Sequence, residues 1–276
     1  MTAAMRERGG RRPEGGSPLT WRSWWALWGG GCAVAVVAFW IATRLGPLTL
    51  ASGAPWADPI WRLRATRAVA AAIVGGALGI AGAAMQGLLR NPLGEPYLLG
   101  MSSGAGVGVR LGGVLGWGAG WLAWRTPLLA LAGALMAGAI VYAVAWRGGW
   151  RDPWSLVLAG VMMNVINGAI IMALYLWSDP WQLDEFARWS MGEIPEVVEP
   201  ALLLAGGLMA TAGAGLLCGQ AAALNAIVMG DETALSVGVP VTAVRRWVAI
   251  ASGLATAAAV SMAGPVSFVG LLVPHI

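Results

Sequence analysis

Long apolar runs separated by short polar breaks dominate the chain. A helix rises 1.5 Å per residue, so about 20 apolar residues can cross a hydrocarbon layer of about 30 Å. The pattern predicts an all-α fold, a polytopic transmembrane helical bundle with about seven complete spans and a partial eighth. The predicted spans are 26–43, 68–89, 97–117, 127–146, 154–177, 200–217 and 247–262, followed by a run at 265–276 that is too short to cross.

The stretch 64–104 shows how such a span is built. Its apolar run, 68–89, contains no charged residue. Small residues recur in it at every fourth position and predict a smooth helix face on which other helices approach closely. The polar break from Arg90 to Pro96 ends the helix, because each proline lacks an N–H and disfavours α geometry in the residue before it. The small residues are Gly75, Gly79, Ala83 and Gly87.

Composition supports a membrane protein. The chain is 58% hydrophobic and only 11% charged, whereas soluble domains carry about 25% charged residues. All 17 basic residues are arginine, without the interleaving of basic and aromatic residues that is typical of RNA binding. We therefore expect membrane lipid, and no nucleic acid, as a partner.

The residues available for chemistry are few. Without any lysine the chain has no phosphate-binding P-loop of its own. The run Gly104-Ala-Gly106-Val-Gly108 lacks the spacing and the preceding strand of a dinucleotide loop, so helix packing is the better interpretation. A single histidine, His275, excludes paired-histidine metal sites and a Ser-His-Asp triad within the chain. The sequence predicts no catalytic residue, cofactor or metal site.

Arginine counts indicate the orientation. Residues 1–25 are polar and arginine-rich, and we interpret them as a disordered cytoplasmic tail. With the N-terminus inside, ten arginines lie on the cytoplasmic side and six outside, which favours this topology. Arg62, Arg64 and Arg67 cluster outside, against the bias, and such a cluster needs another explanation.

Two stretches carry a resemblance to a known family. The first contains Arg64-x-x-Arg67 and then Gln86-Gly-x-x-x-Asn-Pro-Leu-x-x-Pro-x-x-Leu-Gly100. The second contains Gly230-Asp-Glu-Thr-Ala234 and then Gly264-Pro-x-x-Phe-Val-Gly-Leu-x-x-Pro-His275. Together they resemble the permease subunits of ABC importers for iron-siderophores, haem and cobalamin, the FecCD family. The resemblance covers residues 26–276 as one permease domain in the bacterial plasma membrane.

The resemblance implies two contact sites and several partners. Arg64 and Arg67 match an external arginine pair that docks acidic residues of an extracytoplasmic substrate-binding protein. The connection 218–246 matches a cytoplasmic coupling segment of two short helices that fits a groove on separate ATPase subunits. The permease would pair with a second copy of itself or with a paralogous permease. The coupling residues are Gly230, Asp231, Glu232, Thr233 and Leu235.

Polar residues inside predicted spans add two expectations. Asn164 and Asn167 lie three residues apart on a span that resembles the family helix along the translocation path. They face that path or, alternatively, make hydrogen bonds between helices. Arg110 also lies within a span. An arginine there is costly, and we expect its side chain to reach the outer membrane interface.

Other functions stay open on the sequence alone. An ion-coupled secondary transporter would place ionisable groups at the midplane, and no acid lies in any predicted span. A membrane-embedded enzyme would need a nucleophile with a base, or metal ligands. Family members typically have about ten spans, so we expect this permease domain to be incomplete at its C-terminus. A non-functional, truncated permease is therefore a further alternative.

Overall fold

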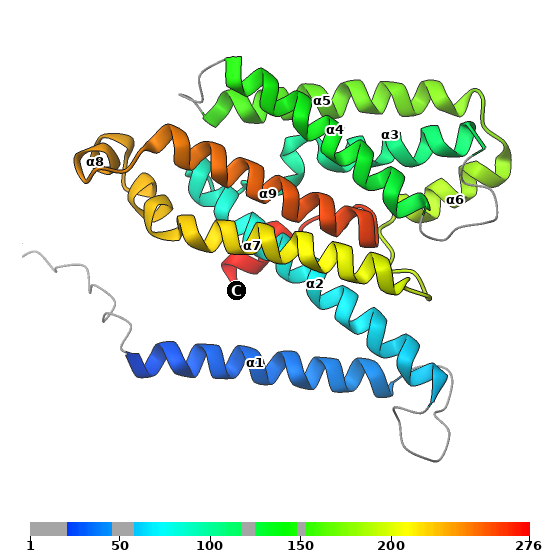
Figure 1. The fold of residues 1–276 in the computed structure, drawn as a ribbon, viewed down its shortest axis with the longest axis horizontal. Coiled ribbons are helices and arrows are strands. Elements are labelled where there is room, and N and C mark those ends of the chain that lie inside the picture. The colour runs from blue at the N-terminus through cyan, green and yellow to red at the C-terminus, as the bar shows by residue number, and fades with distance from the viewer. Residues whose placement is uncertain (1–20, 46–57, 117–124, 148–152) are drawn as a thin grey trace, which may run out of the picture.

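The computed structural model describes residues 21–45, 58–116, 125–147 and 153–276. Most of the described residues are helical, and Figure 1 shows most helices running side by side as a bundle. Five of them are long and apolar enough to cross a membrane. These are α2 (Pro59–Leu89), α4 (Arg125–Arg147), α5 (Pro153–Tyr175), α7 (Pro200–Val228) and α9 (Val241–Ala263).

The remaining helices complete the bundle. Helix α1 (Trp21–Arg44) lies at the periphery, with α2 as its principal neighbour (Figure 1). Helix α3 (Met101–Val114) follows the 3-10 helix η2 (Pro96–Leu99). Helices α6 (Pro180–Ser190) and α8 (Asp231–Ser236) lie at opposite ends of the bundle (Figure 1). The chain ends in α10 (Val269–Leu272) and η3 (Val273–His275).

The predicted fold class is confirmed, and several boundaries are corrected. Helix α1 begins at Trp21, inside the stretch predicted as tail, and residues 1–20 lie outside the described part. The third predicted span, 97–117, is interrupted at Gly100, whose φ of 77° ends η2. Helix α3 therefore has 14 residues, about 21 Å, and falls short of a hydrocarbon layer.

The predicted connection 218–246 is mostly helix. Helix α7 continues to Val228 and α9 begins at Val241, so only residues 229–240, around α8, lie outside these two long helices. Residues 218–228 are less apolar than a span, although their alanines favour a helix. The first turns of α9 contain Arg245 and Arg246, so hydropathy places the start of this helix too late.

Helix α9 forms the centre of the bundle. It packs against α2, α4 and α7, and 78% of its apolar window is buried. The residues of its middle turns are mostly alanine, glycine, serine and threonine, and these small side chains let the neighbouring backbones approach. In contrast, only 17% of the apolar window of α5 is buried. Helix α5 therefore presents most of its apolar surface outward.

Glycines set the closest helix contacts. A Cβ placed on Gly82 would lie 1.8 Å from the carbonyl oxygen of Gly270, so α2 and α10 touch through their backbones. The predicted four-residue face of α2 is right only in part. Gly79 and Gly87 do face neighbours, whereas Gly75 has open space and Ala83 is exposed. Gly104 and Gly108 pack closely against α4, in agreement with the helix-packing interpretation.

Candidate functional site

The α8 end of the bundle gathers the coupling residues that the sequence predicts. Gly230 has a φ of 129°, a conformation that side chains rarely adopt, and it reverses the chain between α7 and α8. Asp231, Glu232, Thr233 and Leu235 all lie on α8. Glu232, Thr233 and Leu235 are exposed, and Leu235 retains 61% of its accessible surface.

Asp231 differs from its neighbours because its carboxylate faces the bundle. Its Oδ2 pairs with Nη2 of Arg245 at 2.7 Å, and its Oδ1 pairs with Nη2 of Arg90. Arg245 lies in the first turns of α9 with a side chain only 6% exposed, and Arg90 is the C-cap of α2. Neither arginine was predicted as part of the site. Arg90 lies inside the first motif that carries the family resemblance, whereas Arg245 lies between the two motifs of the second stretch.

A groove borders α8. It has a volume of about 480 Å³ and lies between Leu235, the first turn of α9 and Trp146 at the end of α4. The guanidinium of Arg246 lies 5.4 Å from the ring centre of Trp146, a cation–π distance. The α8 end thus offers apolar and positively charged groups to a partner.

At the opposite end, α2 carries the two predicted docking arginines. They lie inside α2 and not before it, because the helix begins at Pro59, where the Asp58 side chain accepts from the N–H of Ile60. Arg64 is half-buried, and its Nη1 donates to the carbonyl oxygen of Arg44 at 3.2 Å. Arg67 is exposed. A spacing of three places both on the same side of the helix.

Asn164 and Asn167 make hydrogen bonds between helices. Ser103 of α3 donates through Oγ to Asn164 Oδ1 at 2.7 Å, and Asn167 Nδ2 donates to the same Oγ at 2.9 Å. Asn167 is 2% exposed, whereas Asn164 is partly exposed. In this single chain the two asparagines therefore follow the second of the two expectations, hydrogen bonds between helices, here between α3 and α5.

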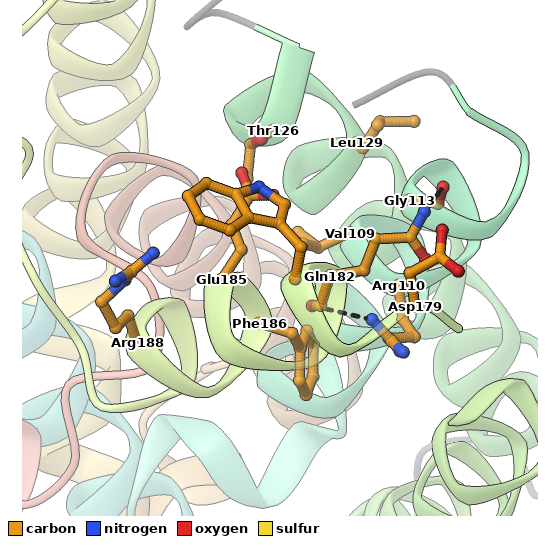
Figure 2. A pocket seen from close by; sticks show the side chains of 11 residues that line it. Val109, Arg110, Gly113, Thr126, Leu129, Asp179, Gln182, Glu185, Phe186 and Arg188 are labelled. Carbon is orange, nitrogen blue, oxygen red and sulfur yellow. Dashed lines mark hydrogen bonds between the residues drawn. The ribbon is translucent and has the colours of Figure 1, made fainter. Parts of the chain in front are cut away.

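The expectation for Arg110 is wrong. Its side chain is 1% exposed and does not reach an interface; it lies under α6, where Nη1 donates to the carbonyl oxygen of Gln182 at 3.0 Å (Figure 2). Gln182 Nε2 donates in return to the carbonyl oxygen of Gly113. The rings of Tyr175 and Phe186 lie 4.9 and 5.6 Å from the guanidinium carbon. These contacts satisfy part of the guanidinium inside the protein, so snorkelling is unnecessary.

A cavity of about 610 Å³ adjoins Arg110 between α3, α4 and α6 (Figure 2). Its lining includes two acids, Asp179 and Glu185, and one further base, Arg188, which pairs with Asp184 at 3.0 Å. Among the described residues no group of three or more histidine, cysteine, aspartate or glutamate side chains could hold a metal ion.

The turn after α2 also holds residues 266–271 near the end of the described chain, a role that the sequence did not suggest. The backbone N–H of Phe268 donates to Glu95 Oε1 at 2.9 Å, and that of Val266 donates to the Tyr97 hydroxyl at 3.0 Å. Gln86 Nε2 donates to the carbonyl oxygen of Leu271 at 3.2 Å. The two stretches that resemble known permeases are therefore in direct contact.

Comparison with known proteins agrees with this arrangement. The model of the FecCD transport family matches residues 33–276, nearly the whole described bundle. The chain belongs to the FecCD transport family. This FecCD chain is 34% identical over 240 residues to the vitamin B12 import system permease protein BtuC of Salmonella typhi and of Salmonella newport. Each match covers 83% of this chain and 72% of the relative.

A solved structure described as an inward-facing conformation of a metal-chelate type ABC transporter has the same fold as this FecCD chain. The TM-score is 0.79 at 24% identity, and the match covers 92% of this chain and 80% of the other. The family match, the BtuC relatives and the five apolar helices together make the FecCD chain a multi-pass membrane protein of the permease type.

Proposed function

We propose that this chain is the membrane-spanning permease subunit of an ABC importer, with ATP hydrolysis carried out on separate subunits. The observation that supports this most strongly is the 34% identity to vitamin B12 import permeases along 83% of the chain. Cobalamin is therefore the first cargo to test, before ferric siderophores and haem. We further infer a bacterial plasma-membrane location with the N-terminus and the α8 end in the cytoplasm.

Helix α8 is the proposed contact for the ATPase subunits. Glu232 and Leu235 are exposed on it, and the groove beside Leu235 adds an apolar recess. ATP-driven closure of two ATPases would push on the α8 elements of two permease copies and tilt the spans between them. The largely unburied apolar face of α5 is suited to pairing with such a second copy.

Arg64 and Arg67 are the proposed docking site for an extracytoplasmic binding protein. Guanidinium groups pair bidentately with carboxylates and steer a charged partner into register. Arg67 is exposed, while Arg64 keeps a fixed position through its bond to Arg44. Along the proposed translocation path, Asn164 is the member of its pair that retains exposed surface.

Reconstitution into lipid vesicles with an ATPase subunit and a binding protein tests the function. We expect labelled cobalamin to accumulate only when ATP is present, and not with an ATPase whose P-loop lysine is replaced. Ferric siderophore and haem serve as competing cargoes and assign the substrate class. Uptake driven by an ion gradient without the ATPase would instead support a secondary transporter, and no uptake of any cargo would support a non-functional chain.

Charge reversal tests the docking site. Arg64→Glu with Arg67→Glu should weaken binding of the binding protein at least about tenfold, since two attractive pairs become repulsive. Arg62→Glu, at the same helix end but outside the motif, is the matched control and should cost less. Equal losses in both variants would contradict a specific docking pair.

A further inference from the structure

We propose that Arg90, Asp231 and Arg245 form a clamp that makes α8 move as one body with α2 and α9. This inference rests on the proposed function, because it explains how a push on α8 would reach the spanning helices. It also changes the role of Asp231. Within the coupling element Asp231 is a positioning residue, and Glu232 and Leu235 are the contact residues.

The two carboxylate oxygens of Asp231 are both engaged by the bundle. Oδ1 pairs with Arg90 and Oδ2 pairs with Arg245. Charge-assisted pairs of this kind are short and directional, so a carboxylate held from two sides has little freedom left to turn outward. The side chain of Arg245 is nearly buried, whereas those of Asp231 and Arg90 are 37% and 39% exposed. The clamp is therefore anchored on α9 and open to water on its α2 side.

Arg90 holds two elements at once. While Nη2 pairs with Asp231, Nε donates to the carbonyl oxygen of Ile227 in the last turn of α7 at 2.8 Å. The backbone of Arg90 is left-handed, with a φ of 49°, and its N–H closes α2 on Gln86 and Gly87. This conformation costs a residue other than glycine about 1 kcal/mol or more. The contacts of the Arg90 side chain with Asp231 and Ile227 offset this cost.

The clamp connects the two proposed partner sites through one helix. Helix α2 has 31 residues and is about 46 Å long. It carries Arg64 and Arg67 towards one end and is capped by Arg90 at the other. A displacement of α8 that is transmitted to Arg90 thus acts on the same helix that would dock the binding protein. An unclamped α8 would instead yield locally when pushed.

Hydrogen–deuterium exchange on the purified chain tests the clamp without any partner. Asp231→Asn removes the charge and keeps the shape, so amide exchange across residues 231–239 should rise about tenfold or more. Glu232→Gln is the matched control: it neutralises the adjacent, exposed acid and removes only its interaction with the helix N-terminus, so the exchange should rise by no more than about threefold. Slow exchange in the rest of the bundle reports that each variant is folded. Unchanged exchange in Asp231→Asn would overturn the clamp.

The assembled importer separates positioning from contact. Asp231→Asn should keep the ATPase subunit bound during purification but transport severalfold less cargo for each ATP hydrolysed. Leu235→Asp should lose the ATPase subunit, and Asp231→Glu, which retains a carboxylate, should restore part of the transport. Loss of the ATPase in Asp231→Asn, as in Leu235→Asp, would make Asp231 a contact and overturn the proposal. If the unaltered chain binds no ATPase subunit, the proposed function fails, while the exchange result still decides on the clamp.

Discussion

Two arginines are buried at opposite ends of the bundle, and their guanidinium groups have different partners. Arg245, near α8, is 5% exposed and faces the Asp231 carboxylate. Arg110, under α6, is 1% exposed, and no acid pairs with it among the described residues. Instead it has one carbonyl oxygen and two aromatic rings as partners, and its Nε and Nη2 lack a hydrogen-bond acceptor in the described part of the chain.

The difference indicates two uses of a buried charge. A carboxylate held between two guanidinium groups makes a directional connection, and its removal takes a counter-charge away from a buried guanidinium. A guanidinium between aromatic rings gains cation–π attraction and packing, and these interactions depend less on direction than an ion pair does. We therefore interpret the α8 end as a rigid junction, and Arg110 as an attachment that holds α6 onto α3.

The largest loss of stability should follow removal of the Asp231 carboxylate, which Arg90 and Arg245 share. Asp231→Ala removes the carboxylate that the buried Arg245 faces, and we expect a loss of about 2 kcal/mol in the free energy of unfolding. This is less than the roughly 3–5 kcal/mol of a fully buried pair, because Asp231 is partly exposed and its charge is screened. Thermal unfolding in detergent measures the loss. A loss below about 0.5 kcal/mol would remove the contrast with Arg110.

Replacing Arg110 should have a smaller effect. Arg110→Met has a similar length and removes a buried charge that lacks a carboxylate, so the lost carbonyl bond and ring contacts are largely offset. We expect the free energy of unfolding to change by less than about 1 kcal/mol. The same melting experiment applies, with Arg110→Ala as the companion variant that also opens a cavity. A loss above about 2 kcal/mol in Arg110→Met would show that Arg110 holds the fold as strongly as the α8 clamp does.

The smallest expected effect is a difference in salt dependence between the two ion pairs of the clamp. Arg90 pairs with Asp231 where both are over a third exposed, so the cost of Arg90→Gln should fall by a few tenths of a kcal/mol between about 0.1 and 0.5 M salt. The cost of Arg245→Gln should be nearly independent of salt, because that side chain is buried. Equal salt dependence in the two variants would mean that both pairs are solvated alike.

Much of the fold could be predicted because the membrane solvent constrains it. Apolar runs of span length and proline-containing breaks locate α2, α4, α5, α7 and α9, since every backbone polar group in hydrocarbon must be paired internally. Helix ends were less predictable. Alanine-rich turns continue α7 to Val228, which hydropathy alone assigned to a connection.

The candidate site was predictable as a location but not as a geometry. The resemblance implies two short helices in 218–246, and the structure has one of them as α8, whereas the residues of the second form the start of the long helix α9. Which acid faces outward depends on arginines that lie 141 and 14 residues away from Asp231, and local pattern does not report such separations. Similarly, the sequence did not predict that Arg110 is buried. Its partners Gln182, Tyr175 and Phe186 come from elements far along the chain, and the local pattern does not show that they meet.

The sequence by itself determined the class of the protein, its spanning helices and its membership of a transport family, because hydropathy and ordered motifs are properties of the chain. Only the tertiary structure decided which small residues let helices touch and which charges pair. Gly82 meets Gly270 while Gly75 meets nothing, although both lie on α2. The physical reason is the same for glycines and arginines: the energy of a close contact or an ion pair depends on distances between residues that the order of the chain does not fix.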